Sequence, residues 1–173
     1  MAGRLWWLLR YLGHDRVAVL DGGYAAWKKA GYEVTAEVPT PQARTFVPQL
    51  RPDMLVSVED VKNRKPEAVL LDSRAGERYR GEQEPLDPKA GHIPGARHFF
   101  YKDNLQADMT MLPAEQLRNR IADFAEQEII IYCGSGVTAC SNLLALHQAG
   151  RADAKLYAGS WSDWVSYSEN PVA

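Results

Sequence analysis

Residues 129–138 read IIIYCGSGVT, from Ile129 to Thr138, and they decide the fold that we expect for the chain. Residues 129–132 form a continuous apolar run, which is typical of a strand buried on both faces of a parallel sheet. Small residues follow, and the spacing then predicts a helix over Thr138 to Ala149 that is closed by Gly150. A buried strand that enters a glycine loop and then a helix indicates an α/β protein.

The same alternation extends over the preceding and following residues. Val69 to Asp72 is a second run typical of a buried strand, and Lys155 to Tyr157 is a third. Ser57, with the acidic Asp60 three positions later, predicts the start of a short helix. Residues 113–125 have helical spacing. The sequence therefore predicts a parallel sheet flanked by helices.

Composition limits the domain count and the class of partner. The chain has 173 residues, 46% of them hydrophobic, which is enough for one complete core and part of a second. Its formal charge is −2, with basic residues scattered among acidic ones, so we expect neither a nucleic-acid nor a membrane partner. The apolar run Leu5 to Leu9 is too short for a membrane span. Two cysteines, Cys133 and Cys140, make no disulfide scaffold and favour a reducing, cytoplasmic location.

An internal repeat relates the two ends of the chain. An offset of 137 residues aligns Gly13 with Gly150 and Trp27 with Trp164. Both copies read as a helix that ends at a glycine, an apolar strand, a glycine turn and a second helix. The strand of the first copy is predicted at Val17 to Leu20. This agreement predicts a duplicated domain.

The two copies are unequally complete. A long region from about Leu55 precedes the second copy, whereas the first begins at Met1, which aligns with Thr138. We therefore expect an N-terminally truncated chain, with residues 1–38 as the C-terminal remnant of a first domain, residues 39–54 as a linker and residues 55–173 as a complete second domain. Prolines favour an extended linker, and they stand at Pro39, Pro41, Pro48 and Pro52.

Cys133 is the residue most suited to chemistry. It follows its strand at the carboxyl end, the edge of an open α/β sheet at which ligands bind. Gly134 and Gly136 let backbone amides turn toward one point, and these amides and the helix N-terminus stabilise a thiolate. The alternative is a small buried side chain in a strand-to-helix turn. Two glycines after the cysteine add little to packing and favour a nucleophile, whereas Cys140 lies inside the helix and is predicted to belong to the core.

Several motifs together carry a family resemblance. They are LDSR at 71–74 with ERY at 77–79, GHIPGA at 91–96, the loop that follows Cys133, and GSWSDW at 159–164. With these motifs nearly the whole chain resembles the rhodanese family, specifically its two-domain thiosulfate and 3-mercaptopyruvate sulfurtransferases. The resemblance implies the rhodanese α/β fold, with the catalytic cysteine in the second domain and a catalytically silent first domain.

The resemblance also implies roles for individual residues. It makes Cys133 the persulfide-forming nucleophile and Ser135 a group that polarises the thiol of the donor. Arg78 would grip the anionic end of the donor, because a guanidinium holds a carboxylate or sulfonate with two parallel hydrogen bonds. For Arg78 the sequence leaves open a surface ion pair with Glu77 or Glu82. The resemblance also implies that backbone amides bind the substrate, namely those of Gly134, Gly136, Val137 and Thr138.

Other polar and aromatic residues near these motifs have structural interpretations. His92 lies in a GHIPG turn and is predicted to be a hydrogen-bonded structural imidazole rather than a partner of Cys133. Trp161 and Trp164 recur in the first copy as Tyr24 and Trp27, and packing is the better explanation for both tryptophans. Asp72, at a strand end, is expected to cap or orient the following turn.

The predicted reaction is a ping-pong sulfur transfer without a metal or an organic cofactor. A small anionic donor gives its sulfur to Cys133, and the persulfide passes it to cyanide or to a thiol acceptor such as thioredoxin or glutathione. The loop supplies hydrogen-bond donors and no cation, which favours 3-mercaptopyruvate over the dianion thiosulfate. The sequence departs from the family at Leu86, where many mercaptopyruvate enzymes have a second arginine.

Two other functions use the same residues. The chain could be a persulfide carrier or an interaction module without turnover, because the first domain is incomplete. A cysteine-dependent phosphatase on this fold would need an arginine at the end of a longer loop, and Thr138 stands there. The composition of the loop therefore argues against a phosphatase.

Overall fold

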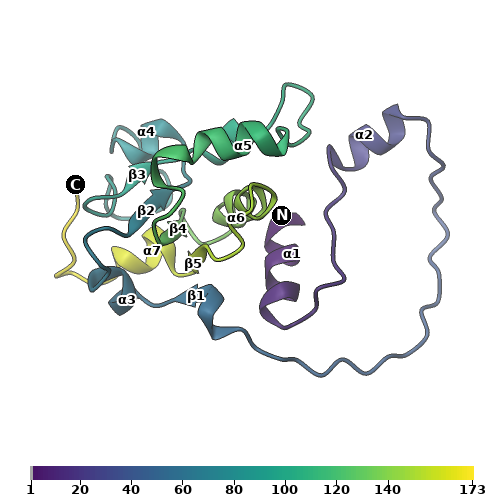
Figure 1. The fold of residues 1–173 in the computed structure, drawn as a ribbon, viewed down its shortest axis with the longest axis horizontal. Coiled ribbons are helices and arrows are strands. Elements are labelled where there is room, and N and C mark those ends of the chain that lie inside the picture. Colours follow the sequence, from purple (N-terminus) through teal and green to yellow (C-terminus); the bar gives the residue numbers. More distant parts are fainter. Residues whose placement is uncertain (1) are drawn as a thin grey trace.

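The computed structural model describes residues 2–173, and its centre is one parallel sheet with the strand order β1-β5-β4-β2-β3 (Figure 1). The strands are β1 (Leu55–Val56), β2 (Val69–Asp72), β3 (Arg97–His98), β4 (Ile129–Tyr132) and β5 (Lys155–Tyr157). The α-helices are α1 (Ala2–Tyr11), α2 (Gly23–Lys29), α3 (Val58–Lys62), α4 (Gly76–Tyr79), α5 (Ala114–Arg120), α6 (Ala139–Gln148) and α7 (Ser160–Trp164). Short 3₁₀ turns are η1 (Pro52–Met54), η2 (Tyr101–Asn104) and η3 (Ala122–Phe124). The predicted α/β class and parallel sheet are confirmed.

Both faces of the sheet are covered, as the continuous apolar runs predict. Every residue of β2 and β4 is buried. Alternate side chains enter two separate clusters: Leu71 and Ile131 pack with α1, α5 and α6, whereas Leu70 and Ile130 pack with α3 and α7 on the other face. Because strand side chains alternate between faces, an unbroken apolar run is the pattern that such a strand requires.

The crevice at the carboxyl ends of β2 and β4 is the topological switch point of the sheet. These strands are neighbours, with Leu71 beside Ile131 and Asp72 beside Tyr132. The chain leaves β2 toward β3 at one edge, and it leaves β4 toward β5 on the opposite side. Connections that diverge in this way open a crevice between the two strands, which is where α/β proteins bind ligands.

Local signals at the helix ends agree closely with the structure. Ser57 caps α3, accepting from the backbone N–H of Asp60 while the Asp60 carboxylate accepts from the N–H of Ser57. The predicted helix at 113–125 is in fact α5 followed by the separate turn η3, with a break at Ile121. The helix predicted over Thr138 to Ala149 is one residue shorter at each end.

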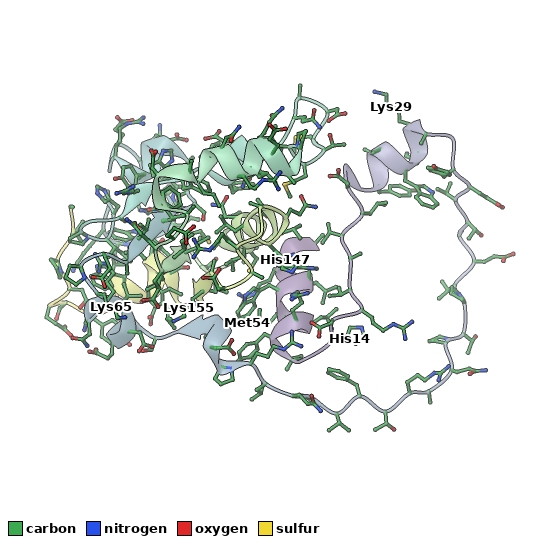
Figure 2. The ribbon with its side chains drawn as sticks, in the orientation of Figure 1. His14, Lys29, Met54, Lys65, His147 and Lys155 are labelled. Atoms are coloured by element: carbon green, nitrogen blue, oxygen red, sulfur yellow. The ribbon has the colours of Figure 1, made fainter. Side chains whose placement is uncertain are left out.

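Helix α1 packs on the sheet-covering helix α6, and its tryptophans Trp6 and Trp7 belong to the same core cluster. Met54 and His147 lie beside α1 in Figure 2, and the Trp6 ring meets the His147 ring edge-on at 5.5 Å. The N-terminal helix is therefore part of the core that covers one face of the sheet. None of the helices within residues 2–173 has the length and hydropathy to cross a bilayer.

The two aligned helices end with the same hydrogen bonds. Gly13, with φ +86°, and Gly150, with φ +97°, both take the left-handed conformation that closes a helix. His14 N–H donates to the Leu9 carbonyl, and at the same offset Arg151 N–H donates to the Leu146 carbonyl. The repeat therefore extends to local geometry, while duplication of a whole domain and the division into the segments 1–38, 39–54 and 55–173 remain predictions.

The prediction of a strand at Val17 to Leu20 is wrong. These residues form neither helix nor strand, and within residues 2–173 no strand pairs with them. A short apolar run becomes a strand only when a neighbour completes its hydrogen bonds, and the corresponding run in the second copy, β5, lies between β1 and β4. After α2 the chain runs in a wide extended arc back to β1 (Figure 1).

Candidate active site

A cavity of about 250 Å³ opens at the carboxyl ends of β2 and β4. Most of the residues predicted from the sequence meet there. The lining comprises Arg78, Leu86, Asp87, Cys133, Gly134, Ser135, Val137, Thr138 and Ser162. Gly136, in the middle of the loop, is buried and does not line the cavity. The parallel pairing of β2 with β4 thus brings together Arg78 and Cys133, which are far apart in the sequence.

Cys133 lies at the base of this cavity and is only 2% exposed. Its backbone is held on both sides by the start of α7: its N–H donates to Ser160 Oγ at 3.1 Å, and its carbonyl accepts from Trp161 N–H at 3.0 Å. The next carbonyl, that of Gly134, accepts from both the N–H and the hydroxyl of Ser162, each at 2.9 Å. These contacts turn the two carbonyls toward α7.

The N–H groups of the loop, unlike its first two carbonyls, have no hydrogen-bond partner within residues 2–173. Within the part of the chain that the structure describes, the N–H groups of residues 134–138 donate to no protein group. Of these residues only Gly136 is buried, so the other amides are open to the cavity or to solvent. Successive N–H groups without a protein acceptor are suited to binding an anion. The loop beside Cys133 therefore carries N–H groups without an acceptor among the described residues, and four of its residues, Gly134, Ser135, Val137 and Thr138, line the cavity.

Gly136 is required by the shape of the loop. Its φ of +71° lies in the left-handed region, and a side chain there would clash with the backbone of Ala158. This contact is consistent with the prediction that Gly136 is needed for the backbone conformation of the loop.

Arg78 reaches the cavity from α4, but acidic residues already engage it. Its Nη2 donates to Glu84 Oε1 at 2.6 Å and lies 3.3 Å from Asp87 Oδ2, while Nε donates to Glu84 Oε2 at 3.1 Å. The alternative that the sequence left open, an ion pair of Arg78 with Glu77 or Glu82, is not formed: the loop after α4 folds back and presents Glu84 and Asp87 instead. Nη1 lies toward Gly134, where an added Cβ would be 3.2 Å away.

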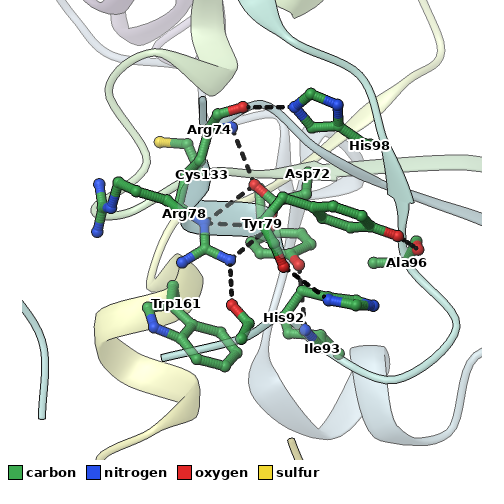
Figure 3. A network of polar contacts seen from close by, with 12 residues as sticks. Asp72, Arg74, Arg78, Tyr79, His92, Ile93, Ala96, His98, Cys133 and Trp161 are labelled. Atoms are coloured by element: carbon green, nitrogen blue, oxygen red, sulfur yellow. Dashed lines mark hydrogen bonds and ion pairs between the residues drawn. The ribbon is translucent and has the colours of Figure 1, made fainter. Parts of the chain in front are cut away.

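Behind Arg78 lies a buried network of charged groups (Figure 3). Arg74 is sandwiched between Asp72 and Glu84, donating to Asp72 Oδ2 at 2.7 Å and to Glu84 Oε2 at 3.2 Å. The same guanidinium donates to the Gly91 carbonyl and stacks 4.6 Å above the Trp161 ring. Asp72 also accepts from the Arg74 N–H, so its predicted role in orienting the turn is confirmed.

Titration of this network follows from its burial. Burial raises the pKa of the Glu84 carboxyl, but hydrogen bonds from Arg78 and from backbone N–H groups more than offset it, so this pKa lies below its ordinary value. Burial, together with the nearby Asp72 carboxylate, holds the pKa of Tyr132 well above its usual range. Glu84 is therefore ionised and Tyr132 neutral at neutral pH.

The structural interpretations of the aromatic motif residues are confirmed. His92 Nδ1 is hydrogen-bonded to the Tyr79 carbonyl at 2.8 Å, and its ring stacks on Tyr79 (Figure 3). Trp161 and Trp164 are buried in the cluster below the sheet. Leu86 is 78% exposed at the mouth of the cavity. Sequence reasoning missed Glu84, Asp87, Ser160 and Ser162, because no local pattern links them to Cys133.

The model for the rhodanese-like domain matches residues 57–167. The chain belongs to the rhodanese family. Strands β2 to β5, the switch-point cavity and the cysteine loop therefore lie within the matched rhodanese-like domain, while α1, α2 and β1 precede it.

Curated relatives in the rhodanese family are sulfurtransferases by name. A probable 3-mercaptopyruvate sulfurtransferase of Pseudomonas aeruginosa is 46% identical over 99% of this chain and 63% of its own length. Mouse thiosulfate sulfurtransferase is 37% identical over 94% of this chain and 58% of its own length. Human 3-mercaptopyruvate sulfurtransferase is 34% identical over 94% of this chain and 57% of its own length. The chain thus spans less than two thirds of these relatives.

Solved structures with the same fold include variants of the enzyme EanB. One, in complex with ergothioneine, has a TM-score of 0.90 and 25% identity, covering 99% of this chain and 44% of that chain. Another carries a cysteine persulfide in a tetrahedral intermediate state with ergothioneine, with a TM-score of 0.88 and 25% identity. It too is covered over 44% of its length.

Glu84→Gln should destabilise the protein by about 3 kcal/mol at neutral pH, because it weakens the pairing of two arginines in a buried network. Since folding lowers the pKa of Glu84, its contribution is complete above about pH 4.3, the ordinary glutamate value, and is lost as the pH falls through the folded value. Urea unfolding of both proteins over this range measures the difference.

The matched control is Glu82→Gln, which removes an exposed partner of Arg80 and should change stability little. Equal effects of the two substitutions, or a Glu84→Gln effect that grows on acidification, would contradict the assignment.

Proposed function

We propose that the chain transfers sulfur through a persulfide on Cys133. The observation that carries the proposal is the shared cavity of Cys133, Arg78 and the loop of residues 134–138, whose N–H groups donate to no protein group within residues 2–173. Relatives named as sulfurtransferases support the reaction class. The cysteine persulfide in the EanB variant supports the form of the intermediate.

The first step is attack of the Cys133 thiolate on the sulfur of the donor. With 3-mercaptopyruvate the carbon–sulfur bond breaks, its electron pair stays on carbon, and protonation gives pyruvate. With thiosulfate the sulfur–sulfur bond breaks and sulfite leaves with the pair. In the second step a thiol acceptor or cyanide attacks the outer sulfur, and Cys133 leaves as the thiolate.

The charges around the cavity favour the monoanionic donor. Arg78 is the guanidinium at the cavity, and Glu84 and Asp87 already pair with it. At position 86 the exposed leucine adds no positive charge. A dianion brings one more negative charge toward these carboxylates than a monoanion does, so we propose 3-mercaptopyruvate as the preferred donor.

Cys133→Ser should abolish sulfur transfer, because a serine hydroxyl forms no persulfide, while the fold persists. Mass spectrometry of the intact chain after exposure to donor should show one added sulfur on the wild type and none on the variant. Retained full activity in the variant would rule out the mechanism. A persulfide without multiple turnover would instead support the carrier hypothesis, and an unmodified wild-type chain would support neither.

Arg78→Ala should raise the Michaelis constant for the donor about tenfold, since a charge-assisted hydrogen bond contributes on the order of 1.5 kcal/mol or more. Arg80→Ala is the matched control, because Arg80 is exposed and pairs with Glu82 away from the cavity. Steady-state kinetics of the three proteins make the comparison. An unchanged Michaelis constant in Arg78→Ala would remove Arg78 from donor binding.

The donor preference should appear as a ratio of kcat/KM values. We expect 3-mercaptopyruvate to exceed thiosulfate by at least about tenfold, the factor that corresponds to about 1.4 kcal/mol of charge repulsion. Both donors are assayed side by side at fixed ionic strength. A higher value with thiosulfate would contradict the charge argument without affecting the assignment of Cys133.

A further inference from the structure

Arg4, on helix α1, reaches across to the loop that follows Cys133. Its Nη1 donates to the Gly136 carbonyl at 3.0 Å and lies 3.8 Å from Cys140 Sγ. This arginine lies outside the region matched by the rhodanese-like domain, which begins at residue 57. Gly3 permits the approach, because a Cβ at that position would come within 3.3 Å of the Cys140 carbonyl.

Cys140 holds the same carbonyl from the other helix. Its Sγ lies 3.3 Å from the Gly136 oxygen, and the side chain is fully buried. Burial raises the pKa of the Cys140 thiol to about 11, so the thiol keeps its proton at neutral pH and donates it to this oxygen. One carbonyl therefore accepts from a guanidinium on α1 and from a thiol on α6.

Anchoring this carbonyl orients an amide of the loop. The peptide unit between Gly136 and Val137 is planar and trans, so its C=O and N–H groups point in opposite directions. With the Gly136 oxygen held toward α1 and α6, the Val137 N–H points away from them. Val137 lines the cavity with Cys133, and its N–H donates to no protein group in residues 2–173.

The loop is thus anchored by two sets of hydrogen bonds, which come from different parts of the chain. The carbonyls of Cys133 and Gly134 are held by backbone and serine groups at the start of α7, inside the matched domain. The Gly136 carbonyl depends on Arg4 and Cys140.

We propose that Arg4 and Cys140 are positioning residues, which hold the Gly136 carbonyl so that the Val137 amide stays directed at the reacting sulfur of Cys133. Helix α1 then controls the reactivity of the Cys133 thiol through the loop that follows it. The inference rests on the proposed function in one respect, that Cys133 is the reacting thiol.

The test measures alkylation of Cys133 by iodoacetamide at neutral pH, with the site mapped by mass spectrometry, together with urea unfolding. Arg4→Met keeps the aliphatic stem and removes the donor, and should slow alkylation about tenfold, as expected for loss of a charged hydrogen bond. Arg4→Lys keeps a charged donor and should restore most of the rate. The control is Arg10→Met on the same helix, which stacks over Trp6 and faces Asp15.

A second pair of variants addresses the other donor. Cys140→Ala removes it and should slow the reaction, whereas Cys140→Ser keeps a hydroxyl for the same carbonyl and should react faster than Cys140→Ala. If Arg4→Met and Cys140→Ala lose stability but react at the wild-type rate, the two residues are packing contacts and the inference is wrong. A Cys133 that fails to react in the wild-type chain would overturn the proposed function, and the inference with it.

Discussion

The parallel pairing of β2 with β4 is the constraint on which the site depends. Asp72 lies beside Tyr132, and the Ser73 N–H continues the ladder to the Tyr132 carbonyl at 2.9 Å. This register ends both strands at the same level, so the turn that leads to Arg78 and the loop that begins at Cys133 share one edge. A slip by one residue would exchange the two buried faces of the strand. The apolar clusters above and below the sheet therefore also hold the cavity in place.

The buried charged residues behind the cavity connect the loop that follows α4 to the sheet. Asp72, Arg74 and Glu84 are nearly inaccessible to solvent, and burial of such charges is costly unless each finds a partner. Arg74 meets this requirement by joining the strand end, the carbonyl of Gly91 and the loop carboxylate of Glu84. The network thereby ties the loop that follows α4 to the sheet. It also presents carboxylates to Arg78, which makes the cavity less positive than one guanidinium alone would.

The N-terminal helix belongs to the same physical unit as the rhodanese-like domain. Trp6 and Trp7 complete the apolar cluster over one face of the sheet, and Arg4 extends from that packed helix to the cysteine loop. A loop of small residues has little side-chain packing of its own. Its conformation therefore depends on the hydrogen bonds that neighbouring groups make with its backbone. The orientation of its amides is thus a property of three helices, α1, α6 and α7, rather than of the loop alone.

The sequence by itself determined the features that local patterns encode. The strands at 69–72, 129–132 and 155–157, the cap at Ser57 and the glycine closures at Gly13 and Gly150 follow from periodicity and backbone preference. The motifs and the position of Cys133 after a buried strand were sufficient to indicate the family and to nominate the residues that meet at the cavity.

Tertiary structure alone decided which groups face one another. Val17 to Leu20 has the composition of a strand but pairs with no strand in residues 2–173, because pairing needs a neighbour that local sequence cannot supply. The partners of Arg78 are Glu84 and Asp87 rather than the acidic residues closer to it in the sequence. The loop that follows α4 folds back and brings these two carboxylates to the guanidinium. Arg4 meets Gly136 across 132 positions of sequence, and only the packing of α1 on α6 makes that contact possible.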